Sequence, residues 1–528
     1  MEDLGPRREI LVRTGLRFLD GWPPTARIAL SIVIPILAFF ALAAWSLSSA
    51  PGSSPDDDFH LPSIWCGQGE RPGLCEATPA SDLSREVPAA LVGSTCYAFR
   101  SDLSADCWES AATGLESVDR VNTGGTYPPV FYAVMSVLAS PDVASSVVGM
   151  RLLNSAFAVA FISGTFFALP RRLRPALIIG VVGTAVPLGL FVLASTNPSS
   201  WAFISAAVTW VALYGATQTR GRRSLVLCGL ALLGAFVGAG ARGDSAAFAV
   251  FGVLLAAILA SRRRASTLGP AIAAACIIAM SAFFFLTSRQ SAGVTTGGTS
   301  EPSGLGQQLS NFLGVPTLWT GALGAAGLGW LDTPLPAVVS VLSFATFAGA
   351  LYLGVARADW RRGVAVGLGI AAMWLVPFVL IVQWNVTVDS LLVQPRYVLP
   401  LLTMTLGVAS LRSGSDRRWT GAAFIFAAAA LAIAQAVALF QNIRRYTVGI
   451  GAQSLGIGSD TAWWWEAGPP AIVVLIVGSV SFAAFLALLG CTFWVRRGTG
   501  EVRRATAKSG LAPAGDSLAE PADQLPER

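Results

Sequence analysis

The feature that most limits the fold of this chain is a series of apolar runs, each close to the length of a membrane-spanning helix. A helix needs about 20 apolar residues to cross the core of a bilayer. Only 12% of the 528 residues are charged, whereas water-soluble domains carry about 25%, so a soluble enzyme is excluded. The sequence predicts an all-α polytopic membrane protein of about 12 transmembrane helices (11–13), near residues 28–49, 151–169, 175–194, 199–217, 224–240, 245–260, 268–286, 334–355, 363–383, 397–411, 419–440 and 470–494.

Arginine clusters alternate with these apolar runs. If residues 1–27 are cytoplasmic, every cytoplasmic loop carries basic residues, as the positive-inside rule requires. We therefore expect a multi-pass plasma membrane protein with both termini in the cytoplasm. The net charge of +6 then mainly reflects topology, so nucleic acid is not expected as a partner. The clusters are Arg7, Arg8, Arg13, Arg17 and Arg27; Arg171, Arg172 and Arg174; Arg220, Arg222 and Arg223; Arg262, Arg263 and Arg264; Arg357, Arg361 and Arg362; Arg412, Arg417 and Arg418; and the residues from Arg496 onward.

This topology divides the chain into four parts. The last part is rich in Ala, Pro, Glu, Arg and Gly, a composition typical of disorder. Chemistry is expected in the long outer segments 50–150, 287–333 and 441–469. The parts are a cytoplasmic N-terminus at 1–27, a transmembrane module at 28–440, an outer loop with the last helix at 441–495, and a disordered cytoplasmic tail at 496–528.

Four cysteines fall in the first outer segment, and three pairings of them are conceivable. An oxidising compartment favours two disulfides. Loop length alone favours Cys66 with Cys75 and Cys96 with Cys107.

The densest group of ionisable residues follows the first apolar run, in Pro55-Asp56-Asp57-Asp58-Phe59-His60. Adjacent carboxylates repel one another, so at least one should have a raised pKa unless a cation compensates. Such a cluster can bind a divalent metal through its oxygens or provide a general base. A solvated acidic turn explains the triplet equally well, and a single histidine such as His60 is more often structural than catalytic.

A short apolar stretch begins at Tyr127-Pro128-Pro129 and ends near Ser140. It is too short to cross a bilayer, and counting it as a span would invert the arginine pattern. We therefore expect an interfacial or re-entrant helix over 128–140. Its aromatic residues are also typical of an interface belt.

Two arginines lie at the outer ends of apolar runs, where positive charge is unexpected. An ionisable residue at membrane depth suggests function. Arg242 precedes Asp244 by two residues, so a mutual ion pair in a tight turn is the alternative. Arg396, in Gln394-Pro395-Arg396-Tyr397, has only Asp389 nearby in sequence, which favours an anionic ligand such as a lipid phosphate.

Other polar residues of the outer segments have a structural explanation that competes with a functional one. Asp332 could belong to a site, but we expect it to cap the following helix, with Pro334 near the first helical position. The same ambiguity holds for Asn197. The tryptophans at 463–465 could stack on a sugar, although interfacial tryptophans usually anchor a helix. No phosphate-binding glycine loop, zinc spacing or serine elbow is present.

Several of these motifs together resemble an actinobacterial family of predicted membrane proteins classed as a domain of unknown function. The resemblance covers roughly residues 28–440. That family is in turn similar to the GT-C glycosyltransferases, membrane enzymes that use polyprenyl-phosphate-linked sugars and carry an acidic motif in the first outer loop. The matching motifs are Asp57-Asp58-Phe59-His60, Tyr127-Pro128-Pro129, Asn197-Pro198-Ser199, Gly329-Trp330-Leu331-Asp332 and Gln394-Pro395-Arg396-Tyr397.

The resemblance implies a role for each matching residue. Asp57 or Asp58 would be the catalytic base that activates a hydroxyl of a cell-envelope glycan acceptor, with inversion at the sugar. Arg396 and Arg242 would bind the donor phosphate. Some GT-C enzymes need Mg²⁺ or Mn²⁺ and others do not, so Asp57 and Asp58 are also the candidate metal ligands. Further substrate-binding candidates are His60, Tyr127, Asn197, Asp244, Asp332, Gln394 and Tyr397.

Two other functions fit the same sequence. One is a transporter or flippase of a lipid-linked saccharide; the other is a non-catalytic partner in cell-envelope assembly. Ion-coupled transporters usually carry acidic residues in mid-span, and the predicted spans contain essentially none. We therefore expect the glycosyltransferase.

Overall fold

The computed structural model describes residues 24–78, 81–260, 268–290, 303–356, 358–411, 421–458, 461–465 and 467–508. Some predicted features lie outside these residues. They are the arginines before residue 24, Arg262, Arg263 and Arg264, Arg357, Arg412, Arg417 and Arg418, and the tail after Lys508.

All twelve predicted apolar runs coincide with helices, and nine helices in the described ranges are long and apolar enough to cross a membrane. Three more runs contain shorter apolar helices, namely α7 (Arg174–Ala185), α11 (Gly243–Leu259) and α17 (Leu399–Ala409). The nine are α2 (Pro24–Leu47), α6 (Val143–Ala168), α9 (Ser199–Thr217), α10 (Arg222–Ala241), α12 (Leu268–Thr287), α15 (Ala337–Val355), α16 (Trp360–Gln383), α18 (Gly421–Val448) and α19 (Ala471–Lys508).

The predicted run at 175–194 is not one continuous helix. It breaks at the cis peptide bond between Val186 and Pro187, which separates α7 from α8 (Leu188–Leu193). Proline has no N–H to donate and its ring collides with the preceding turn, so a helix usually ends there.

The chain divides into two compact units, one of residues 33–486 and one formed by both chain ends. In the second unit, α19 continues past residue 495 to Lys508, so the part of the predicted disordered tail at 496–508 is helical, whereas the rest of that tail lies outside the described residues. Ala, Arg, Glu and Lys in this stretch favour helix.

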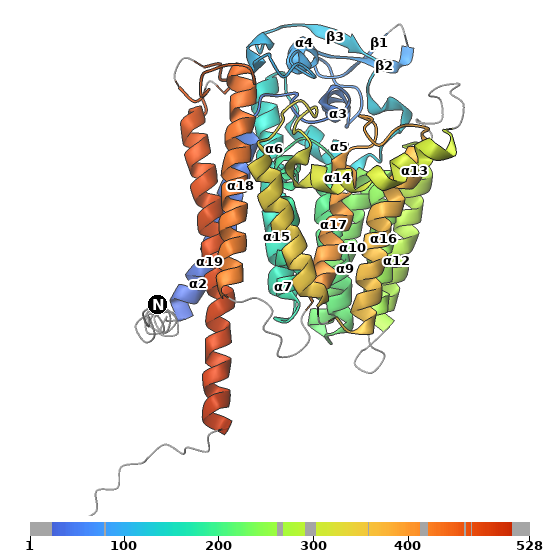
Figure 1. Cartoon of the computed structure of the whole chain (residues 1–528). Coiled ribbons are helices and arrows are strands. Elements are labelled where there is room, and N and C mark those ends of the chain that lie inside the picture. The colour runs from blue at the N-terminus through green and yellow to red at the C-terminus, as the bar shows by residue number, and fades with distance from the viewer. Residues whose placement is uncertain are drawn as a thin grey trace, which may run out of the picture. The chain divides into compact units, whose positions relative to one another are not determined.

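In the larger unit, α9 lies at the centre, with 89% of its apolar stretch buried. It packs against α10, α11 and α17 (Figure 1). Small residues permit this packing: a Cβ on Gly238 of α10 would lie 2.4 Å from the side chain of Ser205 in α9. Glycine and other small residues are typical of helix contacts in membranes because they let backbones approach closely.

The first outer segment folds over one end of this bundle and contains a small sheet (Figure 1). The expectation of an all-α protein is therefore wrong here. Strands β1 (Glu76–Thr78), β2 (Ser81–Pro88) and β3 (Leu115–Val118) pair antiparallel in that order. Outside the apolar runs, strand pairing satisfies backbone N–H and C=O groups as well as helices do. The helices of this segment are α3 (Asp57–Trp65), α4 (Ala89–Val92) and α5 (Val130–Met135).

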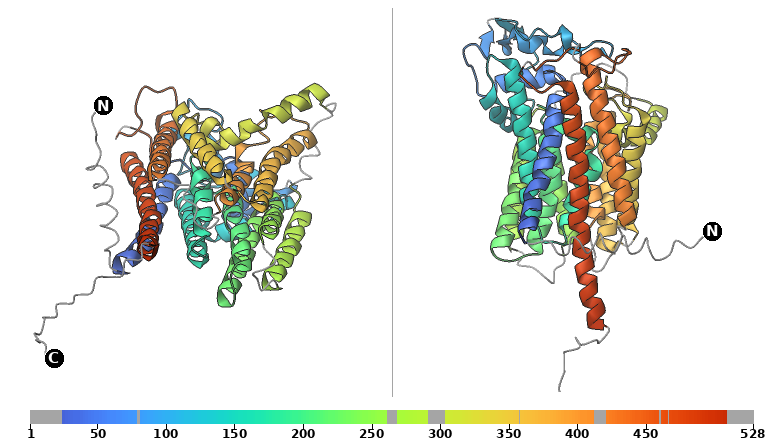
Figure 2. Two further views of the ribbon diagram at one scale, coloured as in Figure 1. Left: turned by 60° about the horizontal axis from the view of Figure 1, so that its bottom comes forward. Right: turned by 90° about the vertical axis from the view of Figure 1, so that its left-hand side faces the viewer.

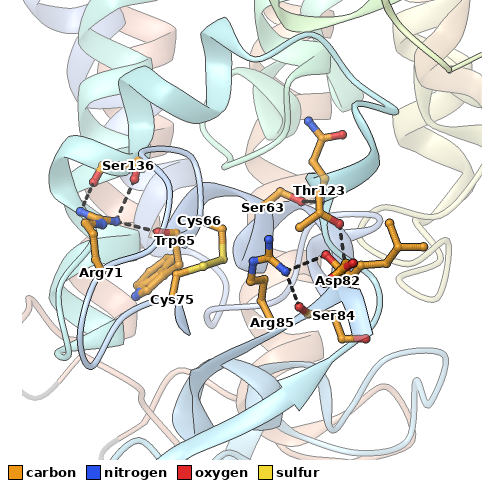
Figure 3. The surroundings of a disulfide bond; sticks show 12 residues. Ser63, Trp65, Cys66, Arg71, Cys75, Asp82, Ser84, Arg85, Thr123 and Ser136 are labelled. Atoms are coloured by element: carbon orange, nitrogen blue, oxygen red, sulfur yellow. Dashed lines mark hydrogen bonds between the residues drawn. A yellow bond between two sulfur atoms is a disulfide. The ribbon is translucent and has the colours of Figure 1, made fainter. Parts of the chain in front are cut away.

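Both predicted disulfides, Cys66–Cys75 and Cys96–Cys107, are present. The short helix predicted over 128–140 is also confirmed as α5, which spans six residues. Figure 3 shows how the loop closed by the Cys66–Cys75 disulfide is connected to Ser136. Within the first disulfide loop, Arg71 donates hydrogen bonds to the Trp65 carbonyl (2.7 Å) and to the Ser136 hydroxyl just after α5 (2.9 Å).

The second outer segment contains the helices α13 (Leu305–Gly314) and α14 (Pro316–Thr320) and the π-helical turn η6 (Gly321–Ala325). In Figure 2, α13 runs across the neighbouring long helices and not along them. Leu305, Leu309 and Leu313 are exposed on one side, while Asn311 is buried and donates to the Val386 carbonyl (3.0 Å). This pattern is typical of a helix that lies in a membrane interface.

Candidate functional site

The site begins at the turn before α3, where Asp56 adopts a left-handed backbone with φ of 60°. Aspartate tolerates this conformation better than most residues. The Asp56 carbonyl accepts the N–H groups of Phe59 (2.9 Å) and His60 (2.8 Å), which starts the helix. The change of backbone direction separates the aspartates, so each of the three contacts different partners.

Asp57, the first candidate base, is buried, and its carboxylate is hydrogen-bonded within the protein. One carboxylate oxygen accepts the Ser54 N–H (2.9 Å) and the other accepts the Thr196 hydroxyl (3.1 Å). Burial raises the pKa of Asp57 to about 7, although the nearby Arg151 guanidinium opposes the rise. Because both carboxylate oxygens accept hydrogen bonds from other residues of the chain, Asp57 stabilises the turn before α3.

Arg151 of α6 stabilises the segment just before the same turn through hydrogen bonds. Its guanidinium is buried and donates to the carbonyls of Ser49 (2.6 Å) and Ala50 (2.9 Å) and to the Ser53 hydroxyl (3.0 Å). A charged donor with several carbonyl acceptors is a strong hydrogen-bonding arrangement. The acidic turn is therefore held rigidly at the end of the bundle.

Asp332 lies on another side of this turn, and the prediction that it caps a helix is wrong. The N-cap of α15 is Pro336, whereas Asp332 forms an ion pair with the buried Arg445 of α18 (2.7 Å). The neighbouring Trp330 donates its indole N–H to the Gly52 carbonyl (2.9 Å). This arrangement gives Asp332 a structural role.

The other two aspartates each form an ion pair and remain half-buried. Asp56 pairs with Arg396, and Asp58 pairs with Arg120. The expectation that Arg396 lacks an acidic partner is therefore wrong, because the fold brings Asp56 to it from far away in sequence. Burial has the largest single effect and tends to raise the pKa of Asp56, but the charge and hydrogen bond of Arg396, with His60 and Arg120, together outweigh it, and the pKa lies below its usual value. Burial raises the pKa of Asp58, against the opposing effect of Arg120.

Arg242 forms the ion pair with Asp244 that the sequence suggested as an alternative. Two guanidinium nitrogens contact the carboxylate, at 2.9 and 2.7 Å, and a third donates to the Ser199 hydroxyl (3.1 Å). The guanidinium also lies over the rings of Tyr127 (5.6 Å) and Tyr397 (5.0 Å). Arg396 lies 5.3 Å from the centre of the same Tyr397 ring. The two candidate phosphate-binding arginines therefore share one aromatic neighbour.

His60 is fully buried beside this pair of arginines. Its Nδ1 lies 2.9 Å from the Tyr132 hydroxyl, and its ring packs 5.4 Å from that of Tyr127. Burial lowers the pKa of His60 to about 3, with help from Arg396 and Arg242 and against the effect of Asp56. The imidazole is therefore neutral near pH 7.

Four buried polar atoms in this region have no hydrogen-bond partner among the described residues. They are Oδ1 of Asp58, Nε2 of His60, and Nε and Nη1 of Arg396. Buried polar groups are normally paired, and exceptions require an explanation. Asp58, His60 and Arg396 each interact with Asp56, and all three retain free hydrogen-bonding capacity, as expected of a site for a polar ligand.

The remaining candidates lie at the edge of this group. The Asn197 side chain donates to the Pro55 carbonyl (2.8 Å) and accepts from the Ser199 N–H (2.9 Å), so it links the acidic turn to α9. Gln394 donates to the Leu391 carbonyl (2.9 Å). Trp464 and Trp465 are buried, which supports an anchoring role for them.

The described residues do not form a set of ligands that would hold a metal ion at the candidate metal site. Among the described residues, no group of three His, Cys, Asp or Glu side chains could hold a metal ion. Asp57 and Asp58 do not converge on one point, since Asp57 contacts Ser54 and Thr196 while Asp58 contacts Arg120. No step of the chemistry is therefore assigned to a metal.

Sequence reasoning missed five residues of this region. The sequence favours Asp57 and Asp58 of the acidic triplet over Asp56, and the other four residues are arginines and a tyrosine outside the cytoplasmic clusters. A useful signal was available, because arginine outside those clusters deserves the same attention as Arg242 and Arg396. The residues are Asp56, Arg120, Tyr132, Arg151 and Arg445.

Fold and site together define a multi-helix membrane protein with a polar, arginine-containing site at one end of its helices. Comparison with known families is consistent with this class. The chain matches the family described as predicted membrane protein (DUF2142) over residues 39–405, and it belongs to that family. No curated protein and no solved structure matches the chain.

Proposed function

We propose that the protein is an inverting glycosyltransferase, similar to the GT-C enzymes, that moves a sugar from a polyprenyl-phosphate-linked donor to a cell-envelope glycan or glycolipid. The observation that carries the proposal is the buried Arg396 guanidinium, whose Nε and Nη1 have no partner among the described residues while it pairs with Asp56, the carboxylate next to Asp58. A phosphate is the ligand that best matches such donors. A carboxylate beside it can serve as a base.

In this proposal Asp58 is the base, because one of its oxygens is unpartnered and its pKa is raised. That oxygen takes the proton of the acceptor hydroxyl, while the hydroxyl oxygen forms a bond to the anomeric carbon. The bond from that carbon to the phosphate oxygen breaks, and its electron pair leaves with the polyprenyl phosphate. Arg396 and Arg242 stabilise the charge on the departing phosphate. Asp56 orients Arg396, and Asp57 shapes the turn.

A membrane position for the whole reaction is part of the proposal. The nine long helices together with α7, α11 and α17 would give twelve crossings, with the site on the outer face of the plasma membrane and both termini in the cytoplasm. A compartment without nucleotide sugars needs a donor carried by the membrane. The candidate spans contain no acidic residue in their middle, which favours this enzyme over an ion-coupled transporter.

The test is sugar transfer in proteoliposomes that contain the purified protein, a radiolabelled polyprenyl-phosphate-linked arabinose or mannose, and a cell-envelope glycan. We expect Asp58→Asn to lower the rate about 10²- to 10⁴-fold, the range for loss of a general base. Asp119→Asn is the matched control, since Asp119 is exposed in the same outer segment. Full activity of both Asp58→Asn and Asp56→Asn would contradict the enzyme, and movement of the donor across the bilayer without transfer would favour the flippase.

A further inference from the structure

We propose that His60 is a third hydrogen-bond donor of the donor-phosphate site: a neutral imidazole that donates its Nε2–H to a phosphate oxygen, in a tautomer fixed by Tyr132. This inference deepens the proposed function and rests on it for the identity of the ligand. It assigns His60 to binding, whereas a lone histidine is more often part of the core.

The tautomer follows from the hydrogen-bond network. Tyr132 is buried, and its hydroxyl contacts only His60 Nδ1 among the described residues. A phenol hydroxyl has one proton to donate, and Nδ1 is the acceptor within reach. If Nδ1 carried the proton and donated to the Tyr132 oxygen, the phenol proton would have no acceptor among the described residues; we therefore assign the proton of the neutral ring to Nε2. Tyr132 acts as a positioning residue that sets which nitrogen can donate.

The unpaired Nε2 then points to an absent acceptor. A core histidine normally has both nitrogens satisfied, because a buried donor without a partner is unfavourable. His60 is 0% exposed, and Nε2 has no partner in the part of the chain that the structure describes. The ligand that belongs here must accept a hydrogen bond.

The surroundings favour a phosphate as the acceptor. The Tyr127 ring lies 5.4 Å from the imidazole and 5.6 Å from the Arg242 guanidinium. Arg396 interacts electrostatically with His60 and has two nitrogens, Nε and Nη1, without a partner among the described residues. A phosphate has several acceptor oxygens and binds guanidinium groups by charge-assisted hydrogen bonds, whereas an uncharged hydroxyl offers a single, weaker acceptor.

A neutral donor suits this position because arginines already supply the positive charge. The charged groups that act on His60 are Asp56, Arg396, Arg242 and Arg120; burial and the three arginines lower its pKa and outweigh the opposing effect of Asp56, so the ring is uncharged. The two flanking tyrosines remain protonated, since burial raises the pKa of Tyr127 to about 12 and also raises that of Tyr132. His60 therefore adds directionality to the site without adding charge.

Two substitutions of His60 distinguish the role of its Nε2 donor from the role of its Nδ1 contact with Tyr132. The amide nitrogen of glutamine can replace Nε2, whereas the shorter asparagine reaches only as far as Nδ1. We expect His60→Gln to bind polyprenyl monophosphate nearly as well as the wild type and His60→Asn to bind it about 10- to 100-fold more weakly. Tyr132→Phe should also weaken binding, because Nδ1 can then carry the proton.

The measurement is equilibrium binding of radiolabelled polyprenyl monophosphate to the full-length protein in detergent micelles. Binding of phosphate-free polyprenol tests whether the site for the lipid tail is intact. Competition by inorganic phosphate measures how much of the binding comes from the phosphate headgroup and how much from the polyprenyl tail. The thermal stability of each variant is recorded alongside. Unchanged binding by His60→Asn, or equal losses of polyprenyl phosphate and polyprenol, would overturn the inference, as would a failure of folded His60→Gln to bind. Intact phosphate binding without sugar transfer in the wild type would contradict only the proposed glycosyltransferase.

Discussion

Three identical side chains in succession have three different environments in this protein. The left-handed backbone at Asp56 turns the chain, so Asp57 faces the interior while its two neighbours contact arginines from distant segments. Asp57 meets two donors, the Ser54 N–H and the Thr196 hydroxyl. Proximity in sequence therefore says little about which aspartate can reach a substrate.

The two candidate bases should respond differently to the same substitution. In Asp57→Asn, one of the two donors would face an amide N–H₂ instead of an oxygen, and a buried donor without an acceptor costs about 1–3 kcal/mol. We expect a lower melting temperature for Asp57→Asn and little change for the half-buried Asp58→Asn. The measurement is thermal unfolding in detergent. Equal stability of the two variants would show that the contacts of Asp57 are dispensable.

At the scale of elements, close packing of small residues determines where the helices can approach one another. A Cβ on Gly180 of α7 would lie 2.9 Å from the Thr403 carbonyl oxygen and 3.0 Å from Cα of Gly407 in α17. Because both neighbours are backbone atoms, they cannot move aside without shifting a helix. Arg396 immediately precedes α17, so this contact also helps to position the site.

Gly180→Ala should therefore destabilise the protein although alanine favours helices. The expected cost is about 1–3 kcal/mol from overpacking, partly offset by the helix propensity of alanine. The matched control is Gly164→Ala in α6, where an added Cβ meets nothing within 4 Å. Thermal unfolding of both variants is the measurement, with a rise in melting temperature expected only for Gly164→Ala. A rise in both would mean that α7 and α17 can separate freely.

At the scale of the molecule, segments far apart in sequence meet at one end of the larger unit. The first outer segment contributes the carboxylates and His60, the turn after α10 contributes Arg242, and the segment before α17 contributes Arg396. Arg445 of α18 fastens the second disulfide loop through the carbonyls of Tyr97 (3.0 Å) and Arg100 (3.1 Å). The site therefore exists only when the transmembrane helices and the outer segments are both folded.

The proposed topology makes a prediction for the whole chain. Fluorescent protein fused after Arg528 should fold and fluoresce in the cytoplasm, because the arginine clusters hold that side inward. Alkaline phosphatase inserted after Asp119 should be active, because this enzyme forms its disulfides only outside the cytoplasm. The opposite pattern of fluorescence and phosphatase activity would invert the orientation and place the site inside.

The sequence by itself determined the features that depend on neighbouring residues. Apolar runs of spanning length predict the long helices, short cysteine separations predict the two disulfides, and the brief apolar stretch predicts α5. Each of these follows from local length and hydrophobicity. The sequence did not predict the helix break at Pro187 or the small sheet of the first outer segment. Whether a helix continues through a proline, and which strands pair, depends on packing with residues distant in the sequence.

The pairing of charges that are distant in the sequence depends on the packed fold. Asp56 and Arg396 are 340 positions apart and Asp58 and Arg120 are 62 positions apart, and no periodicity in the sequence connects either pair. An ion pair depends on which side chains the packed helices bring within a few ångströms, and that distance is a property of the whole fold. For the same reason the sequence indicated where the polar site lies, whereas the fold determined which aspartate is buried, which arginine keeps free donors and which nitrogen of His60 lacks a partner.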